Sequence, residues 1–322
     1  MELLTSHEIA SARAIVARHV AATPTISWPL LNARLGASAF VKHENHTAVG
    51  AFKVRGGAVY LHELLRREPS VAGVVAATRG NHGQSIARAA AAHNLPCTIV
   101  VPLGNSVEKN GAMRALGATL IERGDDFQQS REYAAQLASE RALHFVPSFH
   151  RDLVRGVSSY WMEFFESFAP HAEPDVVFVP IGQGSGISAC VCARVVSRAR
   201  TRIVGVVSAH APAYRDSFIA GHALERPVTT VLADGLACRV PDAASLTLIL
   251  QHVDDVVAVT DNEVAEAMRQ LFTDTHNVAE GAGAASWAAA MQQRARWSGK
   301  RVGIALSGGN VDREVFARVL SQ

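Results

Sequence analysis

The sequence predicts an α/β protein with two lobes, each built on a mainly parallel β-sheet that helices cover on both faces. Short, continuously apolar runs alternate with longer helical segments from residue 73 onwards, which is typical of parallel sheets buried on both faces. Glycine-rich or polar loops directly follow several of the apolar runs. Because such sheets bind ligands at the carboxyl ends of their strands, we expect the functional residues in these loops.

Local patterns, taken in chain order, define the elements. Apolar residues near one face predict a first helix at 6–20, which the Thr23-Pro24 step ends because proline disfavours a helical conformation in the residue before it. Apolar runs predict strands at 39–42, 73–77, 98–101, 119–121, 144–146, 176–179, 203–207, 256–259 and 302–306. Helical spacing predicts helices at 85–93, 106–116, 127–141, 153–168, 187–200, 262–275 and 284–294.

The composition narrows the class of protein. The chain has 322 residues, of which 48% are hydrophobic and 19% charged, so it can bury a large core. Its net charge of +2 gives no reason to expect nucleic acid or an acidic membrane surface as a partner. No apolar stretch is long enough for a membrane span, and the N-terminus lacks the pattern of a signal peptide, so we expect a cytoplasmic protein. Its 4 cysteines are too few for a disulfide framework.

One lysine stands in a setting that suits amine chemistry. The chain contains only Lys42, Lys53, Lys109 and Lys300, and Lys53 lies between two apolar residues where a loop should lead into a helix. Burial and the positive end of a helix both lower the pKa of a lysine and favour the neutral amine that Schiff-base chemistry needs. The alternative is a lysine that packs its stem on apolar neighbours and extends its ammonium group to solvent.

Three further loops follow predicted strands. TRGNHG, residues 78–83, is either a carboxylate cradle at a helix N-terminus or an ordinary strand-to-helix turn. PIGQGSG, residues 180–186, offers backbone amides that can surround a phosphate, but it matches neither the Walker loop nor the dinucleotide fingerprint. SGGN, residues 307–310, presents a hydroxyl at a strand end or forms a polar turn.

The order of these motifs resembles a known family. KHENHTAVGAFKVRGG, ATRGNHGQSIARAA, VFVPIGQGSGISA, ADGLA, NVAEGAGAAS and ALSGGNVD together resemble the pyridoxal-phosphate (PLP) enzymes of the tryptophan-synthase β type, fold type II, on the threonine/serine dehydratase and serine racemase branch. The resemblance covers nearly the whole chain. It implies a three-layer α/β/α architecture, with residues 1–48 and 149–322 in a large PLP-binding domain, 71–148 in a small domain, and the lysine loop 49–70 at their boundary.

The resemblance also implies roles for particular residues. Lys53 would form the Schiff base with the cofactor aldehyde and serve as the general base, while Phe52 would pack near the cofactor ring. Asn81 would bind the cofactor 3-hydroxyl, and Ser307 would meet the pyridine nitrogen. The phosphate would lie in the loop Gly182, Gln183, Gly184, Ser185 and Gly186, and the substrate carboxylate against Thr78, Arg79, Gly80, Asn81 and His82.

The implied reaction is a β-elimination. A β-hydroxy amino acid, with L-threonine or L-serine expected first, would give a 2-oxo acid and ammonia, and we class the enzyme as a carbon–oxygen lyase of the ammonia-lyase type. Phenylserine and hydroxyaspartate are alternative substrates, a serine-type racemase is an alternative activity, and a non-catalytic binding protein on the same fold is a third alternative. The family suggests a homodimer.

Departures from the family pattern refine these expectations. Arg79 stands where the family usually has serine or alanine; arginine shuttles protons poorly, so racemisation is less expected than elimination. Its side chain could pair with a substrate carboxylate or point to solvent. Residues 207–213 lack the carboxylates of metal-stimulated relatives, so we expect no metal there. The chain ends shortly after SGGN, so we expect no C-terminal regulatory region.

Overall fold

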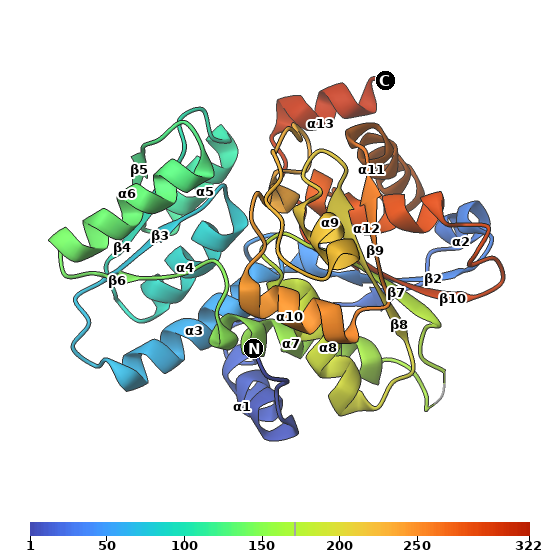
Figure 1. Cartoon of the computed structure of the whole chain (residues 1–322), viewed down its shortest axis with the longest axis horizontal. Coiled ribbons are helices and arrows are strands. Elements are labelled where there is room, and N and C mark those ends of the chain that lie inside the picture. The colour runs from blue at the N-terminus through green and yellow to red at the C-terminus, as the bar shows by residue number, and fades with distance from the viewer. Residues whose placement is uncertain (171) are drawn as a thin grey trace.

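Two β-sheets organise the computed structural model, which describes residues 1–170 and 172–322 (Figure 1). Among these residues the larger sheet has six strands: β1 (Thr25–Ile26), β2 (Ser38–His43), β7 (Val176–Pro180), β8 (Arg202–Ser208), β9 (Asp255–Val259) and β10 (Arg301–Leu306). Their order is β1-β2-β10-β7-β8-β9, and every neighbouring pair is parallel except β1 with β2. The strands of the parallel part therefore end at a common edge.

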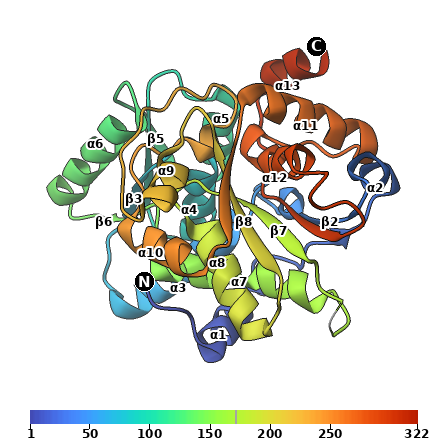
Figure 2. The same cartoon turned by 45° about the vertical axis from the view of Figure 1, so that its right-hand side comes forward.

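Helices cover both faces of the larger sheet. One face packs against α2 (Pro29–Leu35), α11 (Asp261–Thr275) and α12 (Gly281–Gln292), and the other against α7 (Arg151–Glu166), α8 (Ser185–Ser197) and α10 (Ala243–His252). Figure 2 shows α7 and α8 side by side on one side of β7 and β8. Along β7, Val176 and Phe178 join the first core, whereas Val177 and Val179 join the second. This two-sided burial explains why the strand is continuously apolar.

The smaller sheet and its helices form a unit that we call the small lobe. Its strands are β3 (Val74–Ala77), β4 (Cys97–Val101), β5 (Thr119–Glu122) and β6 (His144–Phe145), all parallel, in the order β5-β4-β3-β6. Its helices are α4 (Asn81–Ala92), α5 (Val107–Ala115) and α6 (Phe127–Glu140). Helices α4 and α6 pack on opposite faces of the sheet. Helix α3 (Lys53–Arg67) packs against both α4 and α7 and so connects the small lobe to the rest of the chain.

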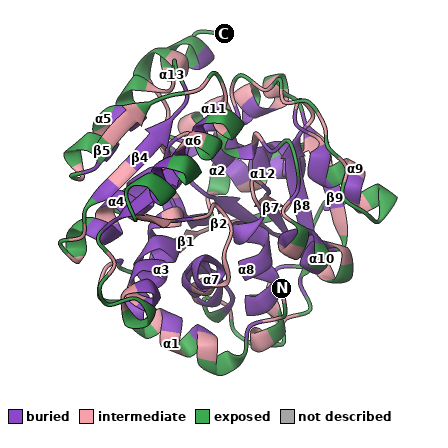
Figure 3. Cartoon of the chain, turned by 60° about the vertical axis from the view of Figure 1, so that its left-hand side comes forward, coloured by how far each residue is buried: buried purple, intermediate pink, exposed green. Residues whose placement is uncertain are grey.

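Burial follows the layers. Figure 3 shows the strands of both sheets mostly buried, while exposed residues gather on outer helices such as α5 and the two terminal helices, α1 (Ser6–Val16) and α13 (Arg313–Leu320). All four cysteines are buried and free. Within the described ranges, no helix is both long enough and apolar enough to cross a bilayer.

The structure confirms every predicted strand to within one residue at each end, and all eight predicted helices are present. The two largest boundary differences are at the first helix, which ends at Val16, and at α4, which begins at Asn81, so the second half of TRGNHG forms a first helical turn. The ends of α7, α8 and α12 are shifted by two or three residues. Elements without a clear period were missed, namely β1, α2, α9 (Ala213–Ala220) and α10. Helix α2 has only seven residues, which is too short to show a period. The assignment of residues 71–148 to a separate domain stays a prediction.

Candidate active site

A single cavity brings together all of the predicted site residues. It is lined by the start of α3, by the loops that follow β3, β7 and β10, and by segments around residues 109, 234–237 and 280–282. The predicted residues among the lining are Phe52, Lys53, Thr78, Arg79, Gly80, Asn81, His82, Gly182, Gln183, Gly184, Ser185, Gly186 and Ser307. The cavity therefore lies between the small lobe and the carboxyl edge of the larger sheet, where parallel sheets bind ligands.

Lys53 is the first residue of α3, and its side chain turns into this cavity. Its Nζ donates a hydrogen bond to Ser185 Oγ at 2.9 Å and lies 4.9 Å from the centre of the Phe52 ring. No carboxylate among the described residues pairs with it, and burial lowers the pKa of Lys53 from 10.5 to about 8. The side chain does not extend to solvent, and a far larger share of this amine is neutral near pH 7 than in a lysine with the ordinary pKa.

The pKa of Lys53 predicts how the cofactor-free protein reacts with an amine-selective reagent. The rate at Lys53 should rise with pH and level off above about pH 8, because about half of the amine is neutral at a pH equal to its pKa. Acidification below pH 8 protonates the amine and slows the reaction. Peptide mass mapping after brief acetylation measures this rate, with exposed Lys300 in the same sample as the reference. A rate at Lys53 that still climbs above pH 10 would contradict the prediction.

The loop between β7 and α8 has the form of an anion cradle. Gly184 caps the N-terminus of α8 with a left-handed φ of 95°, and a Cβ there would clash with Ser245 Oγ. A Cβ at Gly182 would clash with the carbonyl oxygen of Gly235. The free amides at a helix N-terminus favour an anionic group, so the loop fits the phosphate of PLP. Gln183 does not fill the cradle, because its Nε2 lies 3.5 Å from Cys238 Sγ.

Asn81 and Ser307 both line the cavity. Asn81 opens α4; its Nδ2 donates to Glu280 Oε1 at 2.6 Å and its Oδ1 accepts from Asn310 Nδ2 at 2.8 Å. Ser307 directly follows β10 and is buried, and its carbonyl accepts a hydrogen bond from the Phe52 amide at 3.1 Å. The Asn81 side chain is therefore held in place by two hydrogen bonds, and the backbone of Ser307 is held by the residue before Lys53. Their roles toward the cofactor stay predictions.

The loop before α4 is ordered by Thr78. Its Oγ1 accepts hydrogen bonds from the amides of Gly80 at 2.9 Å and Gly83 at 3.2 Å. His82 is 8% exposed, and burial, together with the charge of Lys53, lowers its pKa to about 3. Its imidazole is therefore neutral. The first-turn amides of α4 have no partner within the helix, which suits the predicted binding of a substrate carboxylate.

Sequence reasoning missed three charged residues of the cavity: Lys109, Asp234 and Glu280. Lys109 Nζ lies 2.7 Å from Asp234 Oδ2 and 3.4 Å from Glu280 Oε2. Burial alone would lower the pKa of Lys109, but the charges of Glu280 and Asp234 raise it above its ordinary value. Burial raises the pKa of Glu280 against the opposing charge of Lys109. The scarcity of lysine and the motifs ADGLA and NVAEGAGAAS were the signals that could have found this cluster.

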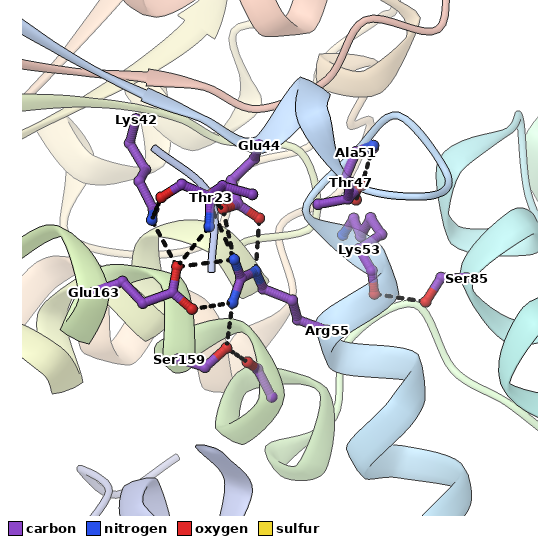
Figure 4. A network of polar contacts seen from close by, with 11 residues as sticks. Thr23, Lys42, Glu44, Thr47, Ala51, Lys53, Arg55, Ser85, Ser159 and Glu163 are labelled. Carbon is purple, nitrogen blue, oxygen red and sulfur yellow. Dashed lines mark hydrogen bonds and ion pairs between the residues drawn. The ribbon is translucent and has the colours of Figure 1, made fainter. Parts of the chain in front are cut away.

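A second charged cluster anchors α3 behind Lys53 (Figure 4). Arg55 is fully buried; its Nε donates to Glu44 at 2.8 Å and one of its terminal nitrogens to Glu163 at 2.6 Å. Lys42 Nζ donates to Glu163 at 2.6 Å and to the carbonyl of Thr23 at 2.7 Å. We call Lys42, Glu44, Arg55 and Glu163 the anchor cluster. Its two cations and two carboxylates tie β2, the short helix η1 (Glu44–His46) and α7 to the helix that carries Lys53.

Comparison with known proteins agrees with this geometry. Residues 16–308 match the family described as pyridoxal-phosphate dependent enzymes (PALP). L-threonine ammonia-lyase of Thermotoga maritima is 31% identical over 321 residues, covering 99% of this chain and 79% of the relative. L-threo-3-hydroxyaspartate ammonia-lyase of Saccharomyces cerevisiae is 32% identical, covering 95% and 93%. The solved structure of maize serine racemase superposes with a TM-score of 0.90 at 26% identity, covering 99% of this chain and 98% of the other.

The chain therefore belongs to the pyridoxal-phosphate-dependent enzymes, and its fold is the predicted fold type II. Its cofactor is PLP, as the motifs indicated. The classification as a carbon–oxygen lyase is wrong, because the related lyases are ammonia-lyases, which are carbon–nitrogen lyases. Among residues 1–170 and 172–322, no group of three or more His, Cys, Asp or Glu side chains is arranged to hold a metal ion.

Proposed function

We propose that the chain is a PLP-dependent ammonia-lyase that converts a β-hydroxy amino acid to a 2-oxo acid and ammonia. The observation that carries the proposal is the placement of Lys53. Its amine, with the pKa lowered to about 8, lies 2.9 Å from Ser185 at the anion cradle and faces the same cavity as the loop ordered by Thr78. The ammonia-lyase relatives support the same reaction.

Different residues of the chain serve different steps of the proposed reaction. PLP, when bound, supplies the aldehyde and the electron sink. Lys53 Nζ takes the proton from the substrate Cα as general base. The loop before α4 holds the substrate carboxylate and orients the bond that breaks. Ser307, with its neutral hydroxyl at the end of β10, would meet the pyridine nitrogen of the cofactor without a negative charge, which would favour elimination over transamination.

A panel of substrates tests the proposal. Holoenzyme is incubated with L-serine, L-threonine, L-threo-phenylserine and L-threo-3-hydroxyaspartate, and the release of 2-oxo acid and ammonia is measured. We expect equal amounts of both products from at least one of them. Chiral analysis of residual serine tests the racemase alternative, which Arg79 disfavours because a guanidinium stays protonated. Absence of both products while PLP remains bound would refute the ammonia-lyase proposal.

Lys109→Met is expected to raise the KM of the best substrate by about tenfold or more, because Lys109 joins the small lobe to two carboxylates across the cavity. Without this cation the pKa of Glu280 rises further, so the acidic limb of the pH–rate profile should move to higher pH. Steady-state kinetics between pH 6 and 9 measure both effects. Arg114→Met on the same helix, at an exposed ion pair, is the control. An unchanged KM and profile would show that the contact does not position the substrate.

Two further proposals concern the assembly and location of the protein. We propose a homodimer, because the resemblance to the dehydratase branch implies one, and a cytoplasmic location, because the four cysteines are buried and free, as is usual in a reducing compartment. Light scattering coupled to gel filtration tests the dimer: a mass of about twice 34.3 kDa supports it, and a mass close to 34.3 kDa contradicts it. Cell fractionation tests the location.

A further inference from the structure

Arg79 lines the cavity, and no residue that the structure describes pairs with its cationic side chain. It lies directly after β3, in the loop before α4. Its Nε is shielded from solvent and forms no hydrogen bond, and no carboxylate of the described residues pairs with its guanidinium group. A buried polar nitrogen left without an acceptor is unfavourable, so the arrangement points to an acceptor that a ligand brings.

The other charged side chains of the cavity have partners, either in the protein or, for Lys53, in the cofactor. Its charged lining residues are Lys53, Arg79, Lys109, Asp234 and Glu280. Lys109 is within ion-pair distance of both carboxylates, and Lys53 is engaged by the cofactor in the proposed function. Arg79 is then the cation of this lining that lacks a counter-charge. A guanidinium group favours a carboxylate, because its planar donors can form two parallel hydrogen bonds to the two oxygens.

The α-carboxylate of an amino acid has another expected place. Thr78 takes up the amides of Gly80 and Gly83, and the remaining first-turn amides of α4, those of Asn81 and His82, can bind it without any cation. We therefore propose that Arg79 binds a second carboxylate, carried on the substrate side chain, and that the preferred substrate is a β-hydroxy amino dicarboxylic acid such as 3-hydroxyaspartate. This inference rests on the proposed ammonia-lyase function and places L-serine and L-threonine second as substrates.

A kinetic comparison of holoenzyme variants tests the inference. The kcat/KM of L-threo-3-hydroxyaspartate divided by that of L-serine is measured for the wild type, Arg79→Ser, Arg79→Lys and the control Arg131→Ser, an exposed arginine on α6. We expect the wild type to prefer hydroxyaspartate and Arg79→Ser to lower the ratio by roughly 10- to 100-fold, mainly through KM. Arg79→Lys should lie between the two, because lysine keeps the charge but loses the paired hydrogen bonds. Arg131→Ser should match the wild type.

A binding measurement provides a readout that does not depend on turnover. Calorimetry of holoenzyme with succinate and with butyrate compares two four-carbon acids that differ by one carboxylate. We expect succinate to bind more tightly to the wild type, and the difference to disappear in Arg79→Ser but persist in Arg131→Ser.

Three results, two with Arg79→Ser and one with the wild type, would overturn the inference. If Arg79→Ser weakens both substrates equally, Arg79 binds the α-carboxylate, and if it mainly weakens PLP binding, Arg79 pairs with the cofactor phosphate. A wild type that prefers L-serine also overturns the inference but leaves the ammonia-lyase function intact. That function fails only if no substrate of the panel gives a 2-oxo acid.

Discussion

Lys53→Ala is expected to reduce the turnover of the preferred β-hydroxy amino acid by about 1,000-fold or more, because the substitution removes both the Schiff-base amine and the general base. It also removes the donor that lies 2.9 Å from Ser185 Oγ at the anion cradle, so PLP should bind more weakly. Release of 2-oxo acid measures turnover, and absorbance measures bound PLP. Lys300→Ala, an exposed lysine distant in sequence, is the matched control and should behave as the wild type.

Chemical rescue shows whether Lys53→Ala loses activity because the amine is missing or because the fold is damaged. Methylamine added to Lys53→Ala can take the place of the missing amine, so partial recovery of turnover that grows with the concentration of neutral amine is expected. Borohydride reduction of the wild-type holoenzyme followed by peptide mapping should place the cofactor adduct on Lys53. An adduct on another lysine, or substantial turnover by Lys53→Ala without added amine, would disprove the assigned role.

Arg55→Met is expected to lower the free energy of unfolding by about 3–5 kcal/mol, because removing one member of a buried ion cluster leaves an uncompensated charge. In the variant Glu163 keeps Lys42, but Glu44 loses its only ion-pair partner in the described structure. Urea denaturation of the holoenzyme measures the effect. Arg66→Met is the matched control on the same helix: its side chain is 69% exposed and pairs with Glu63, so a change of about 0.5 kcal/mol or less is expected.

A second variant distinguishes lost charge from lost packing. Glu44→Gln combined with Arg55→Met removes the orphaned carboxylate, so the double variant should be more stable than Arg55→Met alone. If the double variant is less stable than the single one, the loss comes from packing and hydrogen bonds rather than from an unpaired charge. If Arg55→Met costs no more than Arg66→Met, the anchor cluster does not stabilise the fold.

The strands and the lysine could be predicted because their signals are local. A strand of a parallel sheet that is buried on both faces needs apolar residues at successive positions, as in Val176 to Val179. Helix α10 was not predicted, because its sequence AASLTLILQH is apolar on most sides and therefore shows only a weak helical period. The start of α4 at Asn81 was missed because no side chain caps it.

The sequence by itself determined which segments form strands and which loops follow them, since backbone and burial requirements act over a few neighbouring residues. That Lys53 and the glycine-rich loop share one cofactor site was implied by the resemblance to the family; the structure places both at one cavity, and their roles toward the cofactor stay predictions. Only the tertiary structure decided which charges meet. Lys109 pairs with Asp234, 125 residues away, and Arg79 has no partner among the described residues, because such contacts depend on how the lobes and helices pack around the cavity. That packing, and no local pattern, leaves the guanidinium group of Arg79 as the charge that a substrate can meet.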